Sequence, residues 1–538
     1  MGIAHDNLAA KIIDQALAAG REDAVALSDG PRKWTYAQLA NQIARVATAF
    51  KTIRVQRGDR VAVHMPDCLE AAAAILGAVY HGAVAVPISE LGRAKDIRDI
   101  LNDCGAVAAV AHSNLNPTID EIRSEVVTLR EVLVVGARGP GERDFGSMVR
   151  GSAPAPGPAI VDPGDPAFIL YSAGAGAALV AEGEVQSRRR GVPHSHSTPL
   201  VAFESFGRQF LNLSHDDCVF SVVRVSTAYG LSSGLLFPLL AGAEAALLSD
   251  QPHSSNVFEV INQRAPTVMF ATPSVYGQLA RDAANQVLDK PLASLRTCVS
   301  GAEDMPPKVI DRVKNVLGVD VWVGYGLTEA FQFVICGSAQ AGRPGACGRP
   351  MPGFELRIMS NDGEEVGPDV IGTLQIRGDT VAKKYWGREG STVDDSGWFT
   401  TRDRFMMDAE GNYYHCGRAD HLFKVGGKWV SPGEVEHALL AHEAVWECAV
   451  IGADDEDGLI KPLAFVVPNI GHDPGPELSD ELREFVKKEL APYKYPRWIE
   501  FVDELPKGPA GKILRYKLHE RIKAGKERRR AETASPGS

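Results

Sequence analysis

Short apolar segments alternate with longer amphipathic runs through the first 300 residues of the sequence. An alanine-rich amphipathic run over 36–50 is followed by the apolar stretch RVAVHM, by a run of small residues, and by AVAVP, which ends at Pro87. Apolar segments recur at 132–135, 167–170, 243–248, 267–270 and 296–300, without a fixed repeat length. Strands that alternate with crossover helices form parallel sheets. We therefore predict an α/β fold for this part of the chain.

The pattern changes twice towards the C-terminus. After residue 349, segments such as FELRIM, TLQIRG and WFTTRD indicate strands separated by turns, and after about residue 420 helical and strand patterns mix (VEHALLAHEAV, ECAVIGADD, LREFVKKEL). The Pro/Gly-rich stretch 151–166 reads as a connection between sub-blocks. The predicted fold is thus a large N-terminal domain (1–419) of αβ-sandwich sub-blocks plus a β-rich unit. A small mobile α+β domain (420–522) and a disordered polar tail (523–538) follow.

The composition excludes several classes of protein. With 57 Lys+Arg against 68 Asp+Glu, the net charge of −11 argues against a nucleic-acid or membrane-surface partner. The eight cysteines form no CxxC pair, so a disulfide framework or zinc site is not expected. The N-terminal residues lack a signal-peptide pattern, and the apolar stretch 71–87 is short for a membrane span. We expect a cytoplasmic protein.

Several longer motifs follow one another in a fixed order. They include RGDRVAV, AYGLSSGLLFP (228–238), YGLTE (325–329), GACGRPMPGFELRI, WFTTRDRFMMDAEGNYYHCGRADHLFKVGGKWVSPGEVE and LPKGPAGKILRYKL. The ordered set resembles the adenylate-forming superfamily over nearly the whole chain, and specifically aryl-CoA ligases of the benzoate and anthranilate type. The resemblance implies an acyl-CoA synthetase-like fold and chemistry on an aromatic acyl group.

The resemblance assigns nucleotide-binding roles to YGLTE. Tyr325 offers an aromatic ring that suits stacking on adenine, and Gly326 belongs to the same nucleotide-binding turn. Thr328 and Glu329 supply a hydroxyl and a carboxylate at the phosphate and magnesium positions, and both are implied to be catalytic. No metal site is certain from the sequence, and Glu329 is the ligand if Mg²⁺ is used.

Further roles come from motifs nearer the C-terminus. Asp403 matches the family's ribose-binding Asp, although an isolated Asp in a turn is more often a local cap, and Arg402 stands where the family usually has Gly. Arg418 matches a second nucleotide-binding residue, and Asp420 the hinge of the small domain. Lys512 matches the catalytic lysine that stabilises charge during adenylation, whereas most lysines are simply solvated.

Two further groups of residues are implied to contact the acyl group and its thiol carrier. Gly426 and Gly427 resemble the loop that lines the pantetheine tunnel, where glycine permits close approach of the backbone. The acyl pocket is expected to be lined by Ala228, Tyr229, Gly230 and Gln332. Relatives often have His at the position of Gln332, and an amide brings hydrogen bonds but no titratable charge.

The phosphate loop departs from the family pattern. The family reads close to YSSGSTGKPKG, with glycines, hydroxyls and a lysine that hold the outer phosphates of ATP. This chain has YSAGAGAALVAEGEVQSRRRG over 171–191, with about ten residues inserted. Ser172 and Gly174 remain as nucleotide-binding candidates, and three arginines at 188–190 stand where KPK is expected.

This departure leaves three hypotheses. In the first, which we favour from the sequence, an acyltransferase moves an anthraniloyl- or benzoyl-like group from aryl-CoA to the phosphopantetheine thiol of an acyl carrier protein, in a pathway of the secondary-metabolite type. In the second, an ATP-dependent aryl-CoA ligase forms an aryl-adenylate from an aromatic carboxylate, and the arginines bind phosphate. In the third, the chain is a silent binding or regulatory protein. The implied cofactors are a coenzyme A thioester and AMP, or ATP with Mg²⁺, and a homodimer is possible.

Overall fold

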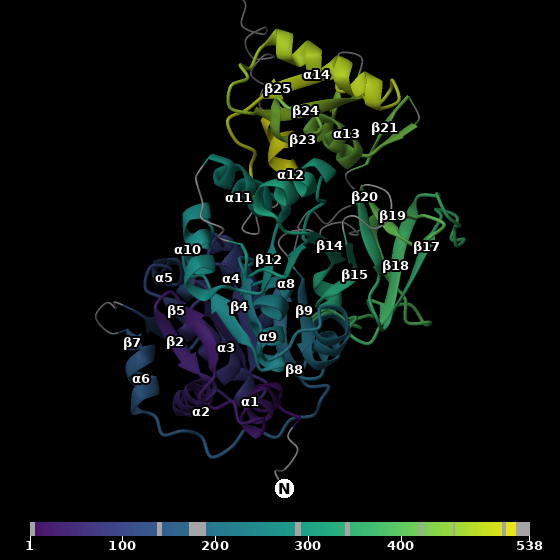
Figure 1. The fold of residues 1–538 in the computed structure, drawn as a ribbon. Helices are drawn as coiled ribbons and strands as arrows, with labels where there is room; N and C mark the ends of the chain where they lie inside the picture. Colours follow the sequence, from purple (N-terminus) through teal and green to yellow (C-terminus); the bar gives the residue numbers. More distant parts are fainter. Residues whose placement is uncertain are drawn as a thin grey trace, which may run out of the picture.

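The chain folds into a large N-terminal α/β domain and a small C-terminal domain, which lies at the top of Figure 1. The computed structural model describes residues 6–136, 142–171, 190–285, 292–338, 345–418, 422–426, 428–455, 458–507 and 513–522. The predicted fold class is confirmed. The boundary at residues 419 and 420 remains a prediction, because these two residues and the tail 523–538 lie outside the described residues.

One sheet of the large domain has seven strands in the order β7-β6-β5-β3-β4-β8-β9. Its strands are β3 (Arg60–His64), β4 (Val84–Ile88), β5 (Ala106–His112), β6 (Glu131–Val135), β7 (Arg143–Asp144), β8 (Pro166–Tyr171) and β9 (Gly191–Ser195). All neighbours pair in parallel except β8 and β9, which are antiparallel. The β8–β9 pair flanks the altered phosphate-loop segment.

The second sheet has thirteen strands in the order β17-β18-β19-β20-β16-β15-β14-β13-β12-β10-β11-β1-β2. Its strands are β1 (Val25–Asp29), β2 (Arg32–Thr35), β10 (Cys218–Ser221), β11 (Glu244–Leu247), β12 (Val268–Ala271), β13 (Thr297–Ser300), β14 (Val321–Gly326), β15 (Phe333–Ser338), β16 (Ala346–Pro350), β17 (Phe354–Met359), β18 (Gly372–Gly378), β19 (Phe399–Met407) and β20 (Tyr413–Arg418). Strand β16 pairs with both β15 and β20. The β-rich unit predicted from the sequence therefore continues the α/β sheet, as the green strands of Figure 1 show.

Helices cover these sheets and connect their parallel strands. In the large domain they are α1 (Leu8–Ala18), α2 (Tyr36–Thr52), α3 (Leu69–Tyr80), α4 (Ala94–Cys104), α5 (Asn116–Ile122), α6 (Phe145–Gly151), α7 (Thr198–Ala202), α8 (Ala228–Gly230), α9 (Phe237–Ala241), α10 (Ser254–Arg264), α11 (Pro273–Asn285) and α12 (Pro307–Leu317). Two 3₁₀ turns, η1 (Arg123–Glu125) and η4 (Thr328–Ala330), and two π-helical segments, η2 (Phe203–Phe210) and η3 (Leu231–Leu236), complete it.

Local sequence explains how the N-terminal helices form and pack. Helix α2 begins with a capping box, in which the Thr35 side chain accepts from the Gln38 backbone and the Gln38 side chain accepts from the Thr35 backbone. Its buried face packs on α3, whose alanine-rich sequence is buried along most of its length. A Cβ atom at Gly77 would lie 2.4 Å from Val46 Cγ1, so glycine permits this close helix contact. The apolar stretch 71–87 is thus interior.

The C-terminal domain has its own core. Strands β23 (Val445–Asp454), β24 (Ile460–Pro468) and β25 (Trp498–Phe501) form a sheet with α13 (Pro432–Leu440) and α14 (Pro476–Glu489), and β21 (Phe423–Val425) pairs with β22 (Lys428–Val430). One cluster of this core centres on Val450, Val466 and Leu482, each 0% exposed. Within the described part of the chain, no helix combines the length and apolarity needed to cross a membrane.

Candidate active site

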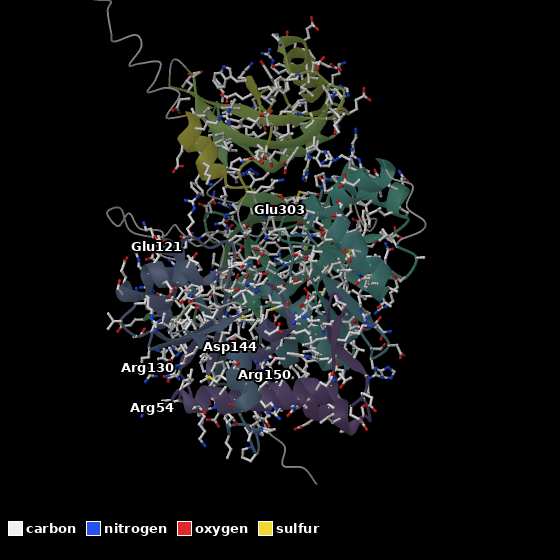
Figure 2. The ribbon with its side chains drawn as sticks, turned by 90° about the vertical axis from the view of Figure 1, so that its left-hand side faces the viewer. Arg54, Glu121, Arg130, Asp144, Arg150 and Glu303 are labelled. Carbon is white, nitrogen blue, oxygen red and sulfur yellow. The ribbon has the colours of Figure 1, made fainter. Side chains whose placement is uncertain are left out.

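A cavity of about 1670 Å³ lies between the two domains. Its walls come from η4 and the ends of β14, β19 and β20, from the segment between β13 and α12, and from α13 of the C-terminal domain. Glu303, in the segment that follows β13, lies directly below the C-terminal domain in Figure 2, while Arg54, Arg130 and Arg150 lie far below it. The cavity is large enough for a nucleotide together with a small acyl group.

One end of the cavity carries a hydrogen-bonded chain of polar side chains. The Tyr325 hydroxyl donates to Asp403 Oδ2 over 2.7 Å. The other carboxylate oxygen, Oδ1, lies 3.3 Å from His415 Nε2, and the His415 Nδ1 atom lies 2.7 Å from Asp304 Oδ1. Strands β14, β19 and β20 supply three of these residues, and Arg418 stands opposite Asp403 in the β19–β20 register.

The charges at this end stabilise one another. Burial raises the pKa of Asp403, but hydrogen bonding and attraction from His415, the hydrogen bond from Tyr325 and the charge of Arg418 outweigh burial and lower it to about 2. Burial lowers the pKa of His415, but Asp304 and Asp403 outweigh burial and raise it to about 10. At neutral pH the site therefore holds an ionised Asp403 beside a cationic His415.

A second polar group surrounds the YGLTE turn. The Tyr385 hydroxyl donates to Glu329 Oε1 over 2.9 Å, and the Arg190 guanidinium lies 5.0 Å from the centre of the Tyr385 ring. Burial, followed by the charge of Glu329, raises the pKa of Tyr385. Thr328 lines the cavity next to Glu329. The arrangement places a carboxylate, a hydroxyl and a guanidinium where a phosphate chain could lie.

The residues of the YGLTE turn could hold a magnesium ion with help from a substrate. Glu329 and Thr328 offer the oxygen donors that Mg²⁺ prefers, and Mg²⁺ commonly takes one or two carboxylates plus substrate phosphates. Among the described residues no group of three or more His, Cys, Asp or Glu could hold a metal ion. The two oxygen donors of this turn thus fit a Mg²⁺ ion that is also bound by substrate phosphates.

The other end of the cavity is lined largely by aromatic and small residues. The Tyr229 ring packs edge-on against Phe333, with ring centres 4.9 Å apart, and its hydroxyl donates to the Val299 carbonyl over 3.1 Å. Burial raises the pKa of Tyr229 well above its usual value, so the phenol stays neutral. A Cβ at Gly230 would lie 2.0 Å from the Arg224 carbonyl oxygen, so only glycine fits this turn. The resulting wall suits a flat apolar group.

Strained backbone borders the aromatic end of the cavity. Phe331 is fully buried with φ of +67°, a conformation that is rare for a bulky residue. Its ring contacts that of His194, with centres 4.8 Å apart. The next residue, Gln332, is 5% exposed and lines the cavity, and within the described structure its Oε1 atom accepts no hydrogen bond. Such strain often accompanies functional turns.

The structure brings together most of the predicted site residues that it describes. Those that line the cavity are Tyr325, Gly326, Thr328, Glu329, Asp403, Arg418, Ala228, Tyr229 and Gln332. Gly230 lies in the turn behind this wall, and Gly426 lies exposed in the turn of the β21–β22 hairpin. Ser172, Gly174, Asp420, Gly427 and Lys512 lie outside the described residues, as do Arg188 and Arg189.

Three residues of the site were not singled out in the sequence. They are Asp304, Tyr385 and His415, which hold or shape the predicted residues. The polar His415 within the strand sequence YYHCGR was a usable signal, because its neighbours Tyr413 and Tyr414 are buried. Asp304 is adjacent to Glu303 in an ordinary loop sequence, so only the tertiary structure identifies its partner.

Comparison with protein families gives two matches. A family described as AMP-binding enzyme matches residues 14–386, and one described as AMP-binding enzyme C-terminal domain matches residues 434–512. Together they span most of both domains.

Curated relatives and solved structures agree with these matches. The benzoate–CoA ligase of Thauera aromatica is 37% identical over 517 residues, covering 95% of each chain. The 4-hydroxybenzoate–CoA/benzoate–CoA ligase of Rhodopseudomonas palustris is 34% identical, covering 98% of this chain and 97% of the relative. The anthranilate CoA ligase AuaEII, solved with anthranoyl-AMP, has a TM-score of 0.87 at 33% identity, covering 95% of this chain and 96% of that chain. A benzoate CoA ligase from Burkholderia xenovorans LB400 has a TM-score of 0.86 at 32% identity, covering 95% and 99%.

Proposed function

This chain belongs to the AMP-binding enzyme family, among its aryl-CoA ligases, and from that premise we propose that it is an ATP-dependent aryl-CoA ligase. The resemblance inferred from the motifs is confirmed. The observation that carries the proposal is one cavity with two chemically different ends: an ionised Asp403 with Arg418 at one end, and the Tyr229–Phe333 wall at the other. These ends suit an adenosine phosphate and an aromatic carboxylate side by side.

The proposed reaction has two steps. In the first, the aryl carboxylate attacks the α-phosphate of ATP, pyrophosphate leaves, and an aryl-adenylate forms. In the second, the thiol of coenzyme A loses its proton and attacks the acyl carbon, and AMP leaves as the thioester forms. Asp403 and Tyr325 hold the ribose and adenine, while Thr328 contacts phosphate. Lys512, whose role we infer from the motif resemblance, stabilises the charge that develops at phosphorus.

The outer phosphates need positive charge. Glu329 would hold Mg²⁺, which when bound neutralises phosphate charge, together with the Thr328 hydroxyl. Arg190 reaches the same end of the cavity through its contact with Tyr385, whose hydroxyl donates to Glu329. An arginine binds phosphate through a planar fork of donors. This contact supports the view that Arg190 replaces the lysine missing from the phosphate loop.

A second candidate function is acyl transfer without ATP. The observation in its favour is the sequence from Ser172 to Gly191, which has lost the family's central hydroxyls and carries an insertion. Only the outer phosphates of ATP need that loop. AMP could attack aryl-CoA to release CoA and form the aryl-adenylate, and the phosphopantetheine thiol of a carrier protein could then attack it and release AMP. Because AMP is consumed in the first step and released in the second, the transfer requires no nucleotide hydrolysis.

Product analysis separates the two candidates. The protein is incubated with anthranilate or benzoate plus ATP, Mg²⁺ and CoA, and separately with the aryl-CoA, AMP and a phosphopantetheinylated carrier protein. Formation of aryl-CoA and AMP in the first mixture, lost in Lys512→Ala, is the expected result. If the first mixture is inactive and the second yields acylated carrier protein, the ligase proposal is overturned and acyl transfer is supported. If neither mixture reacts while the protein is folded, both candidates are wrong.

A further inference from the structure

His415 lies between two carboxylates at the nucleotide end of the cavity. Its Nδ1 atom is 2.7 Å from Asp304 Oδ1, and its Nε2 atom is 3.3 Å from Asp403 Oδ1. Ionised carboxylates accept hydrogen bonds and do not donate them, so with both carboxyl groups ionised each ring nitrogen carries a proton. The imidazole is therefore an imidazolium that joins Asp304 to Asp403.

The position of His415 fixes the orientation of Asp403. A carboxylate rotates easily about its last side-chain bond. Here Asp403 Oδ2 accepts from the Tyr325 hydroxyl while Oδ1 accepts from His415, so two donors on opposite oxygens hold its plane. Each oxygen keeps a second lone pair. Among the described residues, Tyr325 and His415 are the hydrogen-bond donors to this carboxylate, so its remaining lone pairs can accept from a bound diol.

Charge balance gives His415 a second effect on Asp403. An ionised carboxylate that is largely buried needs compensating positive charge, and burial without it would drive the group to take up a proton. Arg418 contributes through its charge from the neighbouring strand position, and His415 contributes both charge and a hydrogen bond. A neutral carboxylic acid would accept one hydroxyl fewer from a sugar.

We propose that His415, held in place by Asp304, is a positioning residue that keeps Asp403 ionised and aimed at the 2′ and 3′ hydroxyls of the nucleotide ribose. This inference rests on the proposed function, because it takes the cavity end at Asp403 to bind an adenosine nucleotide. His415 acts through Asp403, which is the group that touches the ribose.

Binding of two nucleotides tests the inference without turnover. Affinities for AMP and for 2′,3′-dideoxy-AMP are measured by isothermal titration calorimetry on the full chain. The wild type should bind AMP at least about tenfold more tightly than 2′,3′-dideoxy-AMP. In His415→Phe this preference should fall to less than about threefold, while the affinity for dideoxy-AMP stays within about twofold of the wild type. A general loss of structure would instead weaken the binding of both nucleotides equally.

Two more variants complete the test. His442→Phe is the matched control, because His442 also lies near a carboxylate, 3.3 Å from Glu481, but belongs to the C-terminal domain and does not line the cavity. Its ratio of affinities should match the wild type. Asp304→Asn keeps the side-chain shape and removes the charge, so it should lower the preference partway even if His415→Phe fails to fold.

The outcomes are distinguishable. An unchanged preference for AMP in folded His415→Phe, or in Asp304→Asn if the first variant does not fold, overturns the inference and leaves the proposed function intact. A wild type that binds both nucleotides equally also overturns it, since Asp403 then does not hold the ribose. A folded wild type that binds neither nucleotide contradicts the proposed function itself.

Discussion

The substitution Asp403→Asn tests the assignment of the nucleotide end most sharply. An amide can fit the existing network, because its oxygen can accept from His415 and its NH₂ group can donate to the Tyr325 oxygen if the phenol rotates. The fold should therefore survive. The variant loses the negative charge that, in the proposed complex, faces the ribose.

The expected loss of affinity follows from hydrogen-bond energies. Two ribose hydroxyls donate to the Asp403 carboxylate in the proposed complex. A hydrogen bond to a charged group contributes about 1.5–3 kcal/mol, against about 0.5–1.5 kcal/mol for a neutral one. The change costs about 1–1.5 kcal/mol per bond, or about 2–3 kcal/mol together. AMP should therefore bind about 30- to 140-fold more weakly.

Isothermal titration calorimetry with AMP measures this effect, and Asp408→Asn provides a matched control. Asp408 lies on the connection after β19, is fully buried, and accepts from the Tyr414 hydroxyl over 2.7 Å, but it does not line the cavity. This control should lose stability while AMP affinity stays within about twofold. If Asp403→Asn binds AMP as tightly as the wild type, the assignment of the ribose site is wrong.

Three further changes have defined outcomes. Arg190→Met should raise the KM for ATP at least about tenfold and leave AMP affinity within about twofold, because in the proposed complex the guanidinium contacts the outer phosphates, which AMP lacks; an unchanged KM in steady-state assays would exclude that role. Gly230→Ala should lower the thermal unfolding midpoint and the affinity for the aromatic acid, since the added Cβ overlaps the Arg224 carbonyl and overpacking costs about 1–3 kcal/mol; calorimetry showing wild-type stability would contradict the rigid turn. The pKa of His415 is raised from 6.5 to about 10, so its ion pairs stabilise the folded protein fully below pH 6.5 and less and less as pH rises towards 10. The thermal unfolding midpoint of the wild type should therefore fall over pH 7–10 more steeply than that of His415→Phe. Parallel curves for the two proteins would refute the ion pairing.

Much of the fold was predictable because its signals are local. The apolar segments at 132–135 and 267–270 correspond to β6 and β12 within one residue, and the amphipathic run at 36–50 corresponds to α2. Alternation of apolar and amphipathic runs reflects burial of each element, which the sequence records directly. The merging of the β-rich unit with the α/β sheet was not predictable, since it depends on β16 pairing with β20 across about 65 residues.

Part of the candidate site could likewise be predicted from the sequence, and part could not. Tyr325 and Asp403 could be identified from ordered motifs, and the structure places their side chains 2.7 Å apart. The link from His415 to Asp304 spans 111 residues and is created by the packing of β20 beside the segment after β13, so no local pattern predicts it. The positive φ at Phe331, which precedes Gln332, likewise has no local sequence signal, and its ring lies against that of the distant His194.

Aryl-acid-dependent exchange of pyrophosphate into ATP is the sharpest test of the proposed ligase activity, because it reports adenylation alone. The purified protein is assayed with benzoate and anthranilate, beside a benzoate–CoA ligase relative as positive control and Lys512→Ala as negative control. Exchange should require the aromatic acid and disappear in Lys512→Ala. Absence of exchange from a folded protein that binds AMP would contradict the ATP-dependent ligase and leave aryl-CoA as the acyl donor to test.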